Sequence, residues 1–307
     1  MSLTVGVDIG GTKVLGGVVD GSGTVLASCR RDSPAGNAAA LLDTIIEVVS
    51  ELAAAYDVQA VGVGAAGLVD AARSTVLFAA NVAWRDEPLR RTLEEALALP
   101  VVIENDANAA AWAEFRHGAA RDAEDSAVML TVGTGIGGGI ILRGQLFRGA
   151  GGLAGEPGHM VAVRGGLLCG CGRRGCLDRY ASGGALVRFA REGAAVRQSA
   201  LSGAQVLSGR IVAEAARAGD AVAVAAFADV AHWLAQGVAD IVQLLDPQVV
   251  VIGGGVAESG ELLMAPLRTA YGEALRSRAM FAATELRLAA LGCEAGLVGA
   301  ADLAHLN

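Results

Sequence analysis

Asp8-Ile9-Gly10-Gly11-Thr12-Lys13 follows an apolar run that begins at Leu3 and turns back into a second run, Val14 to Val19. The two glycines between β-branched residues predict a tight turn joining two strands. Thr131-Val132-Gly133-Thr134-Gly135 also links an apolar run to a returning one, Gly139 to Leu142. We therefore expect a duplicated strand-turn-strand unit, with one copy in each half of the chain.

Outside these hairpins, apolar residues alternate between the spacing of helices and that of strands. Leu42 to Tyr56 repeats every 3.6 residues, and a long alanine-rich helix is expected over 221–245. Further strands are expected at 24–28, 58–64, 101–104 and 249–252, and further helices at 89–98, 107–117, after Ser182 and at 297–305. This alternation predicts an α/β protein of two lobes with a cleft between them.

The polar stretch Arg121 to Ser126 separates the two copies of the hairpin. We expect a small lobe over 1–118, with the C-terminal helix 295–307 packed back on it. The large lobe is expected over 119–294, and it contains a loop rich in glycine and cysteine.

Composition excludes several classes of protein. Hydrophobic residues make up 53% of the chain and charged residues 18%, which argues against disorder. The net charge of −8 argues against a nucleic-acid partner, which would need a basic surface. The sequence has neither a leader pattern nor an uninterrupted apolar run of about 20 residues, so we expect no membrane partner and a cytoplasmic location.

The first glycine turn has the residues of a phosphate clamp. Gly10 and Gly11 let backbone N–H groups approach phosphate oxygens without a Cβ in the way. Thr12 adds a hydroxyl, Lys13 is the only lysine of the chain, and Asp8 could orient Mg²⁺ or its waters. An ordinary hairpin turn is the alternative for this stretch taken alone.

Two more glycine segments extend this interpretation. Thr131, Gly133, Thr134 and Gly135 would form a second clamp that faces the first. Gly253-Gly254-Gly255 follows a buried strand and is expected to seat the adenosine. None of these segments has the spacing of a Walker loop or of a dinucleotide-binding fingerprint.

Glu104-Asn105-Asp106 ends a predicted strand and opens a predicted helix. Ligands of open α/β sheets lie at the carboxyl ends of strands, so Asp106 could accept the proton of an attacking hydroxyl. A helix N-cap is an equally good interpretation of this aspartate.

His159, Cys169, Cys171 and Cys176 give the pattern H-x9-C-x-C-x4-C. One imidazole and three thiolates complete the tetrahedral ligand set of a structural Zn²⁺ site. The two other cysteines, Cys29 and Cys293, are interpreted as small core residues.

Taken in order, these motifs make the chain similar to the ROK family of sugar kinases and repressors over essentially its whole length. The motifs that carry the resemblance are Asp8 to Lys13, Gly64 to Gly67, Asn81 to Arg85, Glu104 to Ala109, Thr134 to Gly139, Gly155 to His159, the cysteine loop and Gly296 to Ala300. The resemblance implies an actin-like, hexokinase-type (ribonuclease H-like) fold of two lobes, with ATP and Mg²⁺ as cofactors. It also implies a homodimer or homotetramer.

The resemblance also implies roles for single residues. Asp106 becomes the general base, and His159 binds both zinc and a sugar hydroxyl. The other implied sugar-binding residues are Gly67, Asn81, Asn105, Glu156 and Asp178. Two positions depart from the family pattern. Asp178 stands where glutamate is usual, and Pro157 stands where an apolar residue is usual.

The activity implied is ATP-dependent phosphorylation of a hexose, with glucose at its 6-hydroxyl as the leading substrate. Because Asp178 is one methylene shorter than glutamate, another hexose or an N-acetylhexosamine remains the runner-up: fructose, N-acetylglucosamine or N-acetylmannosamine. Polyphosphate as donor and a non-catalytic sugar-binding protein are further alternatives. A sugar-responsive repressor is least favoured, since we expect no helix-turn-helix module before Asp8.

Overall fold

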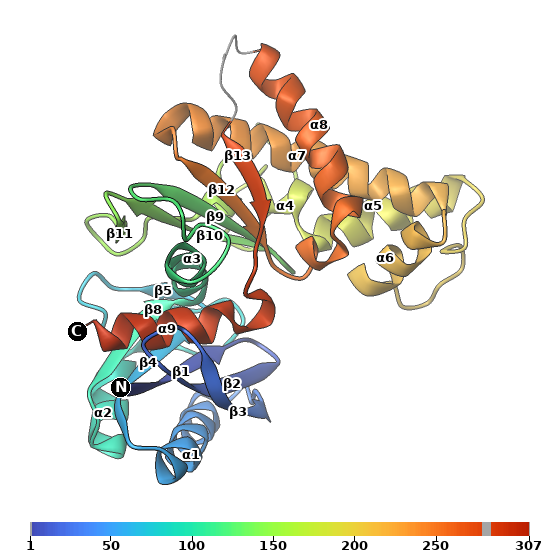
Figure 1. Cartoon of the computed structure of the whole chain (residues 1–307). Helices are drawn as coiled ribbons and strands as arrows, with labels where there is room; N and C mark the ends of the chain where they lie inside the picture. The colour runs from blue at the N-terminus through green and yellow to red at the C-terminus, as the bar shows by residue number, and fades with distance from the viewer. Residues whose placement is uncertain (1, 278–283, 307) are drawn as a thin grey trace. The chain divides into compact units, whose positions relative to one another are not determined.

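The computed structural model describes residues 2–277 and 284–306. The chain forms two compact units, which are described separately (Figure 1). Unit 1 comprises Met1–Met129, Gly139–Gly155 and Ala290–Asn307; unit 2 comprises Leu130–Gly138 and Glu156–Ala289. The lobe boundary expected at 118/119 stays a prediction.

Unit 1 contains a five-stranded sheet in the order β3-β2-β1-β4-β8. Its strands are β1 (Leu3–Ile9), β2 (Lys13–Val19), β3 (Val25–Asp32), β4 (Val58–Ala65) and β8 (Val101–Asn105). β1, β2 and β3 are antiparallel neighbours, and β4 and β8 continue the sheet in parallel from β1. The first predicted hairpin is therefore confirmed, with its turn closed by a hydrogen bond from Gly10 N to Lys13 O (2.9 Å).

Helices cover both faces of this sheet (Figure 1). α1 (Ala38–Ala55) and α2 (Leu89–Leu97) lie on one face, and α9 (Ala295–His305) lies on the other with α3 (Asp106–Arg116). The predicted amphipathic helix is α1, which buries Leu41, Ile45, Val48, Val49 and Leu52. Asn37 begins α1 as its N-cap, because its side chain accepts from Ala39 N and Ala40 N.

Glycines allow α9 to touch the sheet. A Cβ at Gly62 on β4 would lie 1.8 Å from the carbonyl oxygen of Ala300, and one at Gly6 on β1 would lie 1.9 Å from that of Leu297. Any larger residue would force the helix away, since real contacts are never this short. Asp302 then fastens α9 to α3, accepting from Trp112 Nε1 (2.7 Å) and His117 Nε2 (2.9 Å).

A small three-stranded sheet in unit 1 was not expected from the sequence. It consists of β5 (Leu68–Val69), β6 (Val76–Phe78) and β7 (Arg85–Glu87), in the order β5-β6-β7. The turn between β6 and β7 carries Asn81.

The second large sheet has the order β11-β10-β9-β12-β13. Its strands are β9 (Ala127–Val132), β10 (Ile136–Leu142), β11 (Gln145–Leu146), β12 (Val249–Gly253) and β13 (Glu285–Leu288). Each sheet places its first hairpin at the centre and adds its last two strands outward on the same side, so the predicted duplication is confirmed. β10 begins three residues earlier than the expected start at Gly139.

The helices of unit 2 surround one long helix, α7 (Ala221–Leu245), which has the predicted bounds. The others are α4 (Asp178–Ala181), α5 (Gly183–Val196), α6 (Gly209–Arg217) and α8 (Glu261–Ser277), with 3₁₀ turns η1 (Pro157–His159) and η2 (Ala257–Ser259). A third turn, η3 (Gly292–Glu294), precedes α9 in unit 1. Helix α6 was not expected, whereas α8 is the helix expected after Gly253-Gly254-Gly255, and it begins at Glu261.

α7 is long and apolar enough to cross a membrane by length and composition. However, 56% of its apolar window is buried inside the protein, where it contacts α4, α5, α6 and α8. This burial is typical of the central helix of a globular core.

Candidate active site and metal site

The predicted base lies at a sharp corner of unit 1, where β8 ends at Asn105 and α3 begins at Asp106. The Asn105 side chain accepts from Asn108 N at 2.9 Å, so Asn105 is the N-cap of α3. Asp106 Oδ1 accepts from Ala107 N (2.9 Å) and from Asn105 Nδ2 (3.1 Å). The alternative interpretation of Asp106 as the N-cap is therefore wrong, because its neighbour fills that role.

Asn105 also brings Gly67 to this corner. Its Nδ2 donates to Gly67 O at 3.0 Å, which joins the segment after β4 to the start of α3. Asn81 lies instead beside the first glycine turn, since a Cβ at Gly11 would be 3.3 Å from Asn81 Cβ. The structure thus gathers Gly67, Asn105 and Asp106 and places Asn81 next to the predicted phosphate clamp.

A buried ionic cluster that the sequence did not predict supports this corner. Glu104 is 2% exposed, and its Oε2 forms ion pairs with Arg148 Nε and with Arg73 Nε (3.4 Å). Its Oε1 accepts from Asn105 N and from Asn108 Nδ2, each at 3.1 Å. Burial, followed by repulsion from Arg148, lowers the pKa of Arg73 to about 10.

Asp8 lies at the end of β1, close to the first turn of α9. A Cβ at Gly296 would be 2.8 Å from Asp8 Oδ1, so this glycine leaves space for the carboxylate. Burial raises the pKa of Asp8, and the positive charge of Lys13 partly offsets the rise. A carboxylate that is largely removed from water, with one cation beside it, is suited to bind a second cation or its waters.

The second glycine turn is held from several sides within unit 2. Gly133 N donates to Gly135 O (2.9 Å) to close the turn, and Gly183 N donates to Gly133 O (2.7 Å). Gly184 N donates to Thr134 O (3.3 Å). The turn is therefore fixed by the residues that begin α5.

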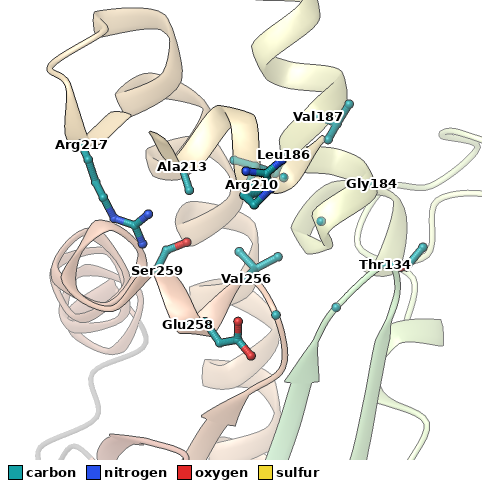
Figure 2. A pocket seen from close by; sticks show the side chains of 14 residues that line it. Thr134, Gly184, Leu186, Val187, Arg210, Ala213, Arg217, Val256, Glu258 and Ser259 are labelled. Atoms are coloured by element: carbon teal, nitrogen blue, oxygen red, sulfur yellow. The ribbon is translucent and has the colours of Figure 1, made fainter. Parts of the chain in front are cut away.

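A pocket of about 620 Å³ opens beside this turn in unit 2. Figure 2 shows residues that line it, among them Thr134, Gly184 and Val256. Gly133 and Gly255 also line the pocket, whereas Thr131, Gly135, Gly253 and Gly254 are not among its lining residues. Gly254 does not line the pocket, but its backbone packs against β9. It has a φ of 85°, and a Cβ there would be 2.7 Å from the Val132 backbone.

The rest of the pocket wall was missed by sequence reasoning. Apolar residues come from α5 and α6, and charged or hydroxyl groups come from α6 and η2: Leu186, Val187, Ala213, Arg210, Arg217, Glu258 and Ser259 (Figure 2). A signal for α6 existed, because Ser208 accepts from Ile211 N as its N-cap. The size and the mixture of apolar and polar groups are typical of a small-molecule site.

The four predicted zinc ligands meet in unit 2. The ligand atoms of His159, Cys169, Cys171 and Cys176 all lie within 4.8 Å of one another. Cys171 Sγ is 3.7 Å from Cys176 Sγ, and Cys169 Sγ is 3.8 Å from His159 Nδ1. A tetrahedron with metal–sulfur bonds of about 2.3 Å has edges of about 3.8 Å, so this donor set fits Zn²⁺.

Cys29 and Cys293 were both expected to be core residues, and the structure corrects one of them. Cys29 is buried on β3. Cys293 is exposed in η3, so its interpretation as a core residue is wrong.

The His159 ring has a second nitrogen available for another role. Its Nε2 lies 4.0 Å from Glu156 Oε2, on the ring edge away from the cysteine contact. Burial raises the pKa of Glu156, and His159 partly opposes this shift. Pro157 occupies the first position of η1, where a missing N–H has no cost, so it fits the local backbone.

Comparison with known proteins identifies the family of this chain. The model of the ROK family matches residues 4–307. The chain belongs to the ROK family. This ROK chain is 43% identical to a glucokinase of Streptomyces coelicolor, over 99% of this chain and 98% of that protein.

Solved structures of ROK-family sugar kinases also match this chain. The crystal structure of a ROK family glucokinase from Streptomyces griseus in complex with glucose and AMPPNP matches with a TM-score of 0.92 and 46% identity, covering both chains completely. A ROK hexokinase from Thermus thermophilus matches with a TM-score of 0.84 and 39% identity, over 99% of this chain and 98% of that one. The expected actin-like, hexokinase-type fold is therefore confirmed for this ROK chain.

Proposed function

We propose that this ROK-family protein is a glucokinase, which transfers the γ-phosphoryl group of ATP to the 6-hydroxyl of glucose. The observation that carries the proposal is the full-length likeness to a glucokinase whose structure was solved with glucose and AMPPNP, an ATP analogue. An N-acetylmannosamine kinase of Yersinia pseudotuberculosis is 37% identical over 83% of this chain, which is a lower identity over less of the chain. A repressor role has no support from the acidic net charge of −8.

Asp106 is the proposed general base. Its Oδ1 is fixed by Ala107 N and by Asn105 Nδ2, so the orientation of the carboxylate is set before any substrate arrives. As the sugar hydroxyl attacks phosphorus, the carboxylate accepts its proton. Because Asn105 caps α3, this aspartate is not needed to begin the helix.

The glycine turns and Lys13 are proposed to hold the phosphates. Backbone N–H groups of both turns and the lysine cation would neutralise charge on the transferring group. Asp8 would hold Mg²⁺ or its waters, and Mg²⁺ supplies positive charge to the phosphate oxygens when it is bound. The pocket beside Thr134 and Gly255 is proposed to take the adenosine.

Glucose is proposed to contact Glu156 and His159 in unit 2 and Gly67, Asn81 and Asn105 in unit 1. Zinc would bind His159 through Nδ1 and leave Nε2 for a sugar hydroxyl, because Nδ1 is the atom near Cys169. The metal would fix the loop that carries this imidazole. A cytoplasmic location and a homodimer or homotetramer stay predictions.

The test measures glucose phosphorylation by purified protein in a coupled assay with ATP, alongside mannose, fructose, N-acetylglucosamine and N-acetylmannosamine. Glucose should give the highest kcat/KM, and polyphosphate should not replace ATP.

Asp106→Asn should lower kcat by roughly a hundred- to ten-thousand-fold with an unchanged circular dichroism spectrum. The matched control is Asp43→Asn on the exposed face of α1, which should keep full activity. Normal turnover in Asp106→Asn would remove this residue from the chemistry.

A further inference from the structure

The sequence suggested Asp178 as a sugar-binding residue, but in the structure its carboxylate contacts backbone next to the second glycine turn. Its Oδ1 accepts a hydrogen bond from Ile136 N at 2.9 Å. Ile136 is the first residue of β10 and directly follows the second glycine turn. The carboxylate is thus bound to the backbone of the segment that borders the nucleotide pocket.

The Asp178 carboxylate lies close to Gly135 of the turn. A Cβ at Gly135 would lie 2.6 Å from Asp178 Oδ1, which is shorter than any real contact. A side chain at this position would therefore displace the Asp178 carboxylate from Ile136 N.

The segment around Asp178 also joins the metal site to the turn. Asp178 is two residues beyond Cys176, and Leu177 N donates to Met160 O (2.8 Å), which ties this segment to the loop after His159. On its other side, the start of α5 holds the turn through Gly183 N and Gly184 N.

The loop before His159 touches the same turn. A Cβ at Gly158 would lie 2.2 Å from Ile136 O. The N–H of Ile136 is therefore held by Asp178 while its carbonyl is covered by Gly158.

We propose that Asp178 is a positioning residue of the nucleotide site: it holds Ile136 N and thereby fixes the backbone of Gly133 and Thr134 against the nucleotide. This inference rests on the proposed kinase function and replaces the expected sugar contact of Asp178. It makes the cysteine loop a support for the phosphate turn as well as for the sugar-binding residues. A hydrogen bond from a backbone N–H to a carboxylate is among the stronger ones, so its loss should be measurable.

Separate binding measurements test the inference, using isothermal titration calorimetry with AMPPNP alone and with glucose alone. In Asp178→Ala, AMPPNP should bind about tenfold more weakly or worse, because Ile136 N loses a charge-assisted partner. Glucose affinity should change less than twofold. Asp178→Asn keeps an acceptor oxygen of the same reach and should restore most of the AMPPNP affinity.

Gly135→Ala perturbs the same contact from the other side and covers the case in which Asp178→Ala does not fold. It should weaken AMPPNP and spare glucose. The double variant Asp178→Ala, Gly135→Ala should bind AMPPNP better than the two losses combined would give, since the clash is gone.

The opposite pattern would overturn the inference. If Asp178→Ala lost glucose binding and kept AMPPNP binding, Asp178 would be a sugar-binding residue and not a positioning residue of the nucleotide site. Additive losses in the double variant would also contradict it. A wild-type protein that fails to phosphorylate glucose in the coupled assay would refute the proposed function instead. The two failures are therefore distinguishable.

Discussion

The buried Glu104 forms an ion pair with the partly exposed Arg148 directly before the corner that carries Asp106. The same carboxylate also faces Arg73 and accepts hydrogen bonds from Asn105 N and Asn108 Nδ2. It therefore joins the end of β8, the first turn of α3 and two loops of unit 1. Glu104 on β8 therefore supports the first turn of α3, where the proposed base lies.

Replacing Glu104 with glutamine should destabilise the protein strongly. Two arginines would lose their buried counter-ion, and breaking such a pair typically costs about 3 kcal/mol or more. Urea unfolding of Glu104→Gln measures the loss. The matched control is Glu51→Gln, whose partner Arg31 is 43% exposed, so it should lose less than about 1 kcal/mol. Equal losses would show that Glu104 contributes no more than a surface charge.

Only part of this cluster could be predicted from the sequence. Asn105 and Asp106 could be placed, because a strand end followed by a polar pair has a known position in α/β sheets. Arg73 and Arg148 could not, because each comes from a loop whose contact with Glu104 depends on the tertiary fold. The capping role also went to the wrong residue, since Asn105 and Asp106 are adjacent and both are good caps.

Zinc removal should be measurable apart from activity. Purified protein should contain about one zinc per chain, since one complete ligand set is present. Cys171→Ser should lose the metal and lower the melting temperature, because metal binding contributes to folding. Cys293→Ser is the matched control: this cysteine is also exposed but lies outside the four-residue cluster, so metal content should stay the same. A stable, active, metal-free protein would contradict the ligand set.

Asp220 should make stability depend on pH at the acidic end. It is the N-cap of α7, and hydrogen bonds from Ala223 N and Ala200 N hold the pKa of Asp220 below its usual 3.8. The native state therefore binds fewer protons than the unfolded state near this pH, and stability rises as pH increases.

The measurement compares wild type with Asp220→Ala. At pH 7 the variant should be about 1 kcal/mol less stable, as for other lost caps. The contribution of the carboxylate charge is present above pH 3.8 and is lost as pH falls through the lowered native pKa. Urea midpoints measured from pH 7 down to pH 3 should therefore converge, and a constant difference would exclude the charge.

Gly62→Ala tests the close approach of α9 to the sheet. Its Cβ would meet the Ala300 carbonyl at 1.8 Å, so the helix must move and the protein should lose about 3 kcal/mol or more. Gly36→Ala is the control, because nothing lies within 4 Å of a Cβ there. Thermal unfolding of both variants measures the difference; a Gly62→Ala protein as stable as the control would mean that α9 does not pack as described.

The fold was easier to predict than the site, with informative exceptions. Both hairpins, α1 and α7 followed from strong periodicity and glycine turns. The short strands β5 to β7 were missed because two- and three-residue strands have too few residues to show a period. α6 was missed because it has only nine residues, too few for a clear helical repeat.

The position of α9 also has a consequence for how the protein is made. The strands that α9 covers are synthesised first, yet α9 follows the whole of unit 2 in the chain. While the ribosome translates unit 2, the glycines of β1 and β4 that face α9 are not yet covered by this helix. The nascent unit 1 must therefore wait with an uncovered apolar face, and it becomes complete only after its neighbour has been translated.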